Sequence, residues 1–119
     1  MKRKNYTTFA AIHLGSEMLS MQITEYHNTE RYKVIECCNR RIRLGEATFK
    51  NKIIPFPLVS EICEILIGFK RLMKEYGVEE YVMQATTAVR EASNQVFLLD
   101  QIYNKTGLVV DVVDMPKEI

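Results

Sequence analysis

The most informative part of this sequence is Ala85-Thr86-Thr87-Ala88-Val89-Arg90-Glu91-Ala92-Ser93-Asn94. It overlaps the end of Tyr81–Thr86, an apolar run that we interpret as a strand. Ligands of open α/β sheets gather outside the carboxyl ends of strands, so hydroxyls and a guanidinium at this place favour an oxyanion site. The structural alternative is that Arg90 only pairs with Glu91 or with another carboxylate.

The segments on either side of this stretch predict two helices and a final strand. Upstream, the apolar residues of Leu58–Tyr76 recur every three or four positions, which predicts an amphipathic helix with Pro57 in its first turn and Gly77 as its stop. Downstream, we expect a helix that is capped by Ser93 or Asn94 and reaches residue 106, followed by a last strand over residues 108–113.

The N-terminal third predicts three antiparallel strands. An apolar run over Thr8–Ile12 ends at Leu14-Gly15-Ser16, and a second strand is expected over Met18–Tyr26. Tyr32–Leu44 supplies the third strand, and residues 45–57, with two prolines, are expected to be a loop. The predicted order is therefore β-β-β-α-β-α-β with a mixed sheet.

Length and composition favour one ordinary domain and exclude several classes of partner. The chain has 119 residues, of which 47% are hydrophobic, and a net charge of +1. Lys and Arg outnumber Asp and Glu by 10 to 5 in residues 1–52, so a polyanion could be attracted locally, but the near-neutral sum predicts no nucleic-acid partner. The absence of a long apolar run predicts no membrane partner.

The cysteines and the N-terminus bear on the expected compartment. Cys37, Cys38 and Cys63 form neither a disulfide framework nor a metal-binding pair, and we expect buried or half-buried thiols in a reducing cytosol. No cleavable apolar segment follows the basic start of the chain. We therefore expect a cytoplasmic protein.

Two further places offer chemistry. The Gly15-Ser16 turn exposes backbone N–H groups and a hydroxyl that can hold a phosphate, although most such turns serve only to reverse the chain. His13, inside an apolar strand, is expected to be a satisfied core histidine. Glu118, which follows the last predicted strand, offers a carboxylate for general-base chemistry or is simply solvated.

Three motifs together resemble a known family. Phe9–Ser16 is similar to the opening "A-x-I-D-L-G-S-N-S" of the N-terminal domain of the Ppx/GppA family, the exopolyphosphatases and guanosine pentaphosphate phosphohydrolases. Arg43-Leu44-Gly45-Glu46 resembles its "R-L-G-E", and Ala85–Asn94 resembles its "A-T-S-A-L-R-E-A-x-N". The resemblance implies an α/β, ribonuclease H-like half-domain of the actin-like ATPase superfamily. Residues 1–119 would then be a single N-terminal domain without the second lobe.

The resemblance also implies an activity and a set of site residues. Water would attack the terminal phosphoanhydride bond of polyphosphate or guanosine pentaphosphate, the expected substrates. Gly15, Ser16 and Arg90 match phosphate-binding positions of the family, and Glu118 matches its water-orienting glutamate. Mg²⁺ is the expected cofactor, between carboxylates and phosphate oxygens.

Departures from the family pattern change what we expect of this chain. The family's aspartate is His13 here, and imidazole is a poor ligand for Mg²⁺, so no residue is assigned to a metal. Glu17-Met18 replaces Asn-Ser and brings a repelling charge, while Asp114-Met115 replaces Ser-Gly. We expect the isolated chain, lacking half of the cleft, to be inactive. The alternative is a non-catalytic phosphate-binding or protein-interaction module, for which the exposed sheet edge suggests a homodimer.

Overall fold

A five-stranded mixed sheet organises the chain in the computed structural model, which describes residues 5–28 and 30–113. The elements are β1 (Thr7–Leu14), β2 (Met18–Tyr26), β3 (Tyr32–Arg41), α1 (Leu44–Asn51), α2 (Phe56–Glu75), β4 (Glu80–Ala85), α3 (Thr87–Arg90), α4 (Gln95–Thr106) and β5 (Asp111–Val112). The strand order is β3-β2-β1-β4-β5. β1, β2 and β3 pair antiparallel, whereas β4 pairs parallel to both β1 and β5, which confirms the expected mixed sheet.

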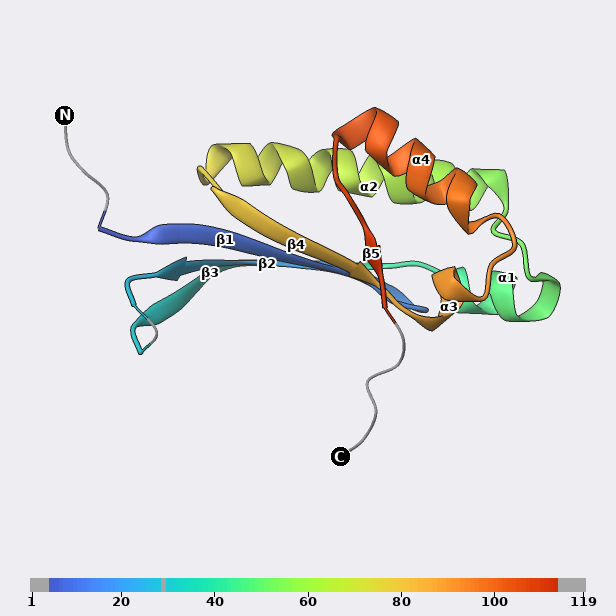
Figure 1. The fold of residues 1–119 in the computed structure, drawn as a ribbon, viewed down its shortest axis with the longest axis horizontal. Helices are drawn as coiled ribbons and strands as arrows, with labels where there is room; N and C mark the ends of the chain where they lie inside the picture. Colours follow the sequence, from blue (N-terminus) through green and yellow to red (C-terminus); the bar gives the residue numbers. More distant parts are fainter. Residues whose placement is uncertain (1–4, 29, 114–119) are drawn as a thin grey trace.

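Helices α2 and α4 lie together on one face of the sheet (Figure 1). The alternation of β1 explains why, because Ala10, Ile12 and Leu14 are buried beneath the helices while Ala11 and His13 are exposed on the other face. Both helices add apolar side chains to this core, with Ile62, Leu66, Phe69, Leu98 and Ile102 among them. The opposite face, which carries the exposed Ala11 and His13, is called the open face below.

The predicted helix ends are confirmed. Pro57 lies in the first turn of α2, where its missing N–H costs no hydrogen bond. Gly77 and Gly107 follow α2 and α4 with φ of 67° and 77°, the left-handed conformation that stops a helix. The turn chemistry of the sequence therefore placed both helix ends to within two residues.

The expected loop over residues 45–57 is wrong, because its first half is helix α1. The two prolines of this segment, Pro55 and Pro57, both follow the helix and do not interrupt it. Leu44 and Thr48 lie one helical turn apart and both are buried, so α1 has a packed side. The two prolines do not exclude a helix that ends before them, so the predicted loop began too early and a short amphipathic helix was missed.

Two strand ends also differ from prediction. β3 stops at Arg41, three residues before the expected Leu44, because Leu44 is the first residue of α1. β5 has only the two residues Asp111–Val112, where residues 108–113 were expected. A short α3 at Thr87–Arg90 also appears within the stretch that opened the sequence analysis.

The cysteines follow the expectation in part. Cys63 is buried in the core and Cys38 is half-buried. Burial raises the pKa of the Cys38 thiol above its ordinary value, and the neighbouring Glu36 carboxylate adds to the effect. Cys37 is exposed, which corrects the expectation for that residue; its place is next to Gln22 on the open face.

In the ranges 5–28 and 30–113, none of the helices is long and apolar enough to cross a bilayer.

Candidate functional site

The predicted phosphate turn connects β1 to β2 and is clamped by backbone hydrogen bonds. The Gly15 N–H donates to the Met18 carbonyl at 2.9 Å. The Ser16 carbonyl accepts from the Gly45 N–H at 2.8 Å, and the Glu17 carbonyl accepts from the Ile42 N–H at 2.9 Å. The Gly15 amide is therefore already hydrogen-bonded within the turn. The Ser16 and Glu17 amides have no backbone acceptor among the described residues.

A cavity of about 310 Å³ lies beside this turn. We call it the turn cavity, and it is lined by Ser16, Glu17, Arg41, Ile42, Arg43 and Glu46. Arg41 is the last residue of β3 and Arg43 precedes α1, so the connection between β3 and α1 places two arginines in the lining of the same cavity as Ser16. Neither guanidinium has an ion-pair partner in the described part of the chain, and both are exposed.

The charges of the turn cavity balance. Two guanidiniums, from Arg41 and Arg43, face two carboxylates, from Glu17 and Glu46. A phosphate would therefore be attracted by directed, charge-assisted hydrogen bonds and not by a strong net positive field. Such a cavity suits an anion that brings its own compensating cation.

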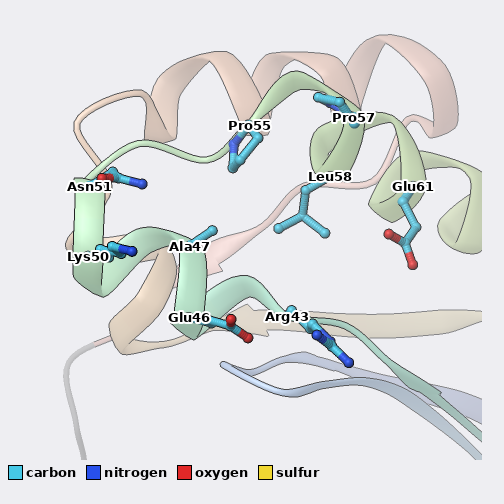
Figure 2. A pocket seen from close by; sticks show the side chains of 9 residues that line it. All are labelled: Arg43, Glu46, Ala47, Lys50, Asn51, Pro55, Pro57, Leu58 and Glu61. Carbon is cyan, nitrogen blue, oxygen red and sulfur yellow. The ribbon is translucent and has the colours of Figure 1, made fainter.

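A second cavity of about 470 Å³ adjoins the first and shares Arg43 and Glu46 with it. Figure 2 shows its lining side chains, which come from Arg43, α1, the loop at Pro55 and the first turns of α2. Its further charged residues are Lys50 and Glu61, so it too is balanced. The two cavities together extend the open space from the turn along α1.

Arg90 follows β4 at the same end of the sheet as the turn that follows β1, but it is not part of the turn cavity. The Thr86 N–H donates to the Leu14 carbonyl at 3.3 Å, which holds the end of β4 against the end of β1. From α3, the half-buried Arg90 donates through Nη1 to the Val113 carbonyl at 3.3 Å. Phosphate binding by Gly15, Ser16 and Arg90 stays a prediction.

The last two residues of the Ala85–Asn94 stretch hold the chain together and do not face the turn cavity. Asn94 accepts from the Ile54 N–H and donates to the Ile54 carbonyl, both at 2.9 Å. The Ser93 hydroxyl and N–H both donate to the Lys52 carbonyl, at 2.9 and 2.7 Å. Asn94 does occupy the N-cap position of α4, as expected, but its side chain makes no capping bond, because it is used across the fold.

His13 corrects the expectation of a core histidine. It is exposed on the open face, opposite Ser20 of β2 and Gln84 of β4. Because successive side chains of a strand alternate between faces, the apolar residues around His13 in sequence point away from it, into the core. The apolar run therefore misled the interpretation of this residue.

The donor set near the turn does not fit a preformed magnesium centre. The described residues contain no group of three or more His, Cys, Asp or Glu side chains that could hold a metal ion. His13 offers nitrogen at the place where the motif that it resembles has an aspartate, and Mg²⁺ prefers carboxylate oxygen. Glu118, the predicted water-orienting residue, lies outside the described residues.

Sequence reasoning missed the role of the residues between β3 and α1. Arg41 was not singled out as a site residue, and Arg43 and Glu46 appeared only within a motif. The signal was present, because three of residues 40–43 are arginines and they come directly before the segment that contacts the turn.

Comparison with known proteins identifies the family. The chain matches the model of the Ppx/GppA phosphatase family over residues 22–119. The chain belongs to the Ppx/GppA phosphatase family. A Ppx/GppA family member from Aquifex aeolicus superposes with a TM-score of 0.86 at 26% identity, over 92% of this chain and 35% of that one. The ribonuclease H-like α/β fold expected from the sequence is thereby confirmed.

Two further proteins extend the comparison. An exopolyphosphatase from Cytophaga hutchinsonii shares the fold, with a TM-score of 0.85 at 22% identity over 91% of this chain and 34% of that one. The bifunctional 3-dehydroquinate synthase/phosphatase of Fusobacterium nucleatum is 24% identical over 127 residues, covering 98% of this chain and 18% of that protein. The chain thus spans about a third of these solved structures and less of the curated relative.

Proposed function

We propose that this chain provides the phosphate-binding N-terminal part of a phosphatase that hydrolyses terminal phosphoanhydride bonds of polyphosphate or guanosine pentaphosphate. The observation that carries the proposal is the turn cavity, which Ser16, Arg41 and Arg43 line together just beyond the carboxyl end of β1. Phosphoryl transfer depends mainly on positioning and on stabilising charge, and these groups supply hydrogen-bond donors of that kind.

Each group has a definite task in this proposal. The Ser16 hydroxyl and the amides of Ser16 and Glu17 donate to oxygens of the terminal phosphate, and the arginines donate charge-assisted bonds to the same or the next phosphate. Arg90 stabilises charge from the neighbouring strand end, and Glu118 orients the attacking water.

We propose that magnesium enters with the substrate. Polyphosphate carries Mg²⁺ on its own oxygens, and the balanced turn cavity accommodates such a complex without a strong positive field. Titration of the chain with Mg²⁺ alone should then show no binding, whereas Mg²⁺ added together with tripolyphosphate should bind.

Tripolyphosphate binding, measured by calorimetry, tests the proposed site. Arg43→Gln removes a charge-assisted hydrogen bond and should weaken binding about tenfold. Arg71→Gln is the matched control, because it removes the same charge from an exposed position in the last turns of α2, at the far end of the sheet from the turn. Equal losses in the two variants would mean that only overall charge matters and would contradict the site.

Phosphate release from long-chain polyphosphate with Mg²⁺ tests catalysis separately. If the chain hydrolyses, Glu118→Gln should abolish release while leaving tripolyphosphate binding unchanged. The second candidate function, a phosphate-binding module without turnover, is favoured by one observation: His13 stands exposed where the family has its aspartate. Binding without release by the native chain would select this second function.

A further inference from the structure

The geometry points to Gly45 as the residue that positions Ser16 of the phosphate turn. The contact between the two residues follows from packing alone, whereas its effect on phosphate binding rests on the proposed function. Gly45 is buried near the start of α1, and its N–H donates to the Ser16 carbonyl at 2.8 Å. We infer that the absence of a side chain at residue 45 sets where the Ser16 hydroxyl and amide lie.

The backbone conformation of Gly45 does not require glycine. Gly77 and Gly107 are the glycines of the described residues with positive φ, and Gly45 is not among them. Inside a helix, glycine is less favourable than alanine, because it loses more backbone freedom on folding. The lack of room for a side chain, and not the backbone conformation, therefore explains the glycine at this position.

The space at Gly45 is taken by Ser16. A Cβ built on residue 45 would lie 2.8 Å from the Ser16 Cβ and 3.4 Å from its Oγ. It would also lie 3.1 Å from the Phe49 ring, but that ring is half exposed at 49% and free to turn aside. The contact with Ser16 is different, because a Cβ moves only when its backbone moves.

Neither side of the contact yields easily. The turn is held by the Gly15–Met18 hydrogen bond and by the bond from Ile42 to the Glu17 carbonyl. The start of α1 is held by Leu44, which is fully buried in the core. An alanine at residue 45 would therefore displace Ser16 and with it the donors that line the turn cavity.

A double-mutant cycle between residues 45 and 16 tests this inference. The four proteins are the native chain, Gly45→Ala, Ser16→Gly and the double variant, and the readouts are the urea midpoint and the affinity for inorganic tripolyphosphate. With Ser16 present, Gly45→Ala should lower the urea midpoint and weaken tripolyphosphate binding about tenfold. With Ser16→Gly, the opposing Cβ is gone, so Gly45→Ala should no longer weaken tripolyphosphate binding and should raise the urea midpoint slightly, because alanine is the better helix residue.

Gly68→Ala is the matched control. Gly68 also lies inside a helix, but nothing stands within 4 Å of a Cβ built there. This variant should keep its tripolyphosphate affinity. The amide resonances of Ser16 and Glu17 should shift in Gly45→Ala and stay in place in Gly68→Ala.

The outcomes separate the inference from the proposed function. Equal effects of Gly45→Ala in both residue-16 backgrounds, or unshifted Ser16 and Glu17 amides, would overturn the inference. If Gly45→Ala does not fold, a folded double variant supports the inference and an unfolded one overturns it. Failure of the native chain to bind tripolyphosphate would overturn the proposed function, and the urea cycle would still decide the contact.

Discussion

Glu17 opposes the arginines that share the turn cavity with it. Its carboxylate belongs to the turn itself, so it repels any phosphate held there. Glu17→Gln should therefore tighten tripolyphosphate binding severalfold, opposite in sign to Arg43→Gln. Calorimetry at low ionic strength measures the change, and Glu75→Gln, at the far end of α2, should leave the affinity as it was. Unchanged or weaker binding in Glu17→Gln would contradict the placement of phosphate beside this turn.

Asn94 is expected to matter more for stability than for phosphate. Its amide makes two hydrogen bonds of 2.9 Å to the backbone of Ile54, whose side chain is fully buried. Asn94→Ala leaves both backbone groups without their partner and should lower the free energy of unfolding by about 2 kcal/mol. Urea unfolding measures this loss. The exposed Asn104 of α4 is the control, because Asn104→Ala removes no such pair; an equal cost in both variants would refute the explanation.

At the scale of elements, two glycines should respond oppositely to the same substitution. Gly107 ends α4 with a φ of 77°, so Gly107→Ala forces an unfavourable backbone conformation and should cost about 1 kcal/mol. Gly68 lies inside α2 with open space around its Cβ position, so Gly68→Ala should add about 0.5–1 kcal/mol of stability. Thermal unfolding of the two variants measures both signs, and a shift in the same direction would contradict the left-handed end of α4 or the open space at Gly68.

The elements also show which parts of the fold the sequence could predict. The bounds of β2 were predicted exactly by alternation, and both glycine stops were predicted because a left-handed residue ends a helix for local reasons. Helix α1 was missed, because its eight residues carry few apolar positions and its packing depends on the turn and on α3. The orientation of Asn94 was missed for the same reason, since its partner Ile54 lies 40 residues away.

The candidate site was predictable only in part. Motifs located Ser16 and the neighbourhood of Arg90, because short stretches of sequence carry them. The joining of Arg41 and Arg43 to the turn depends on the hydrogen bonds that Ile42 and Gly45 make to it, and no local pattern encodes that pairing. Strand alternation alone predicts that His13 is exposed, but the apolar character of its neighbours led to the opposite prediction.

At the scale of the whole molecule, the sheet ends in a long free edge. β3 has ten residues, pairs only with β2 among the described strands, and exposes 61% of Tyr32 and 43% of Val34. Unpaired backbone groups along such an edge can pair with another strand, so we expect self-association through β3. Sedimentation velocity should show a dimer whose fraction rises with concentration, and Val34→Lys should reduce it. A monomer at every concentration would contradict this expectation.

Two motif residues are tied to folding, which matters for sequence searches. Asn94 makes two hydrogen bonds across the fold, and Gly45 contacts Ser16. Both residues belong to stretches that resemble family motifs, yet each is tied to the packing of this domain. A lineage that lost hydrolysis would still lose about 2 kcal/mol of stability if it lost Asn94, so selection for folding alone favours part of the signature. Motif searches therefore group folded descendants without turnover together with working phosphatases. Positions that folding does not need, such as the exposed position occupied here by His13, are free of this constraint.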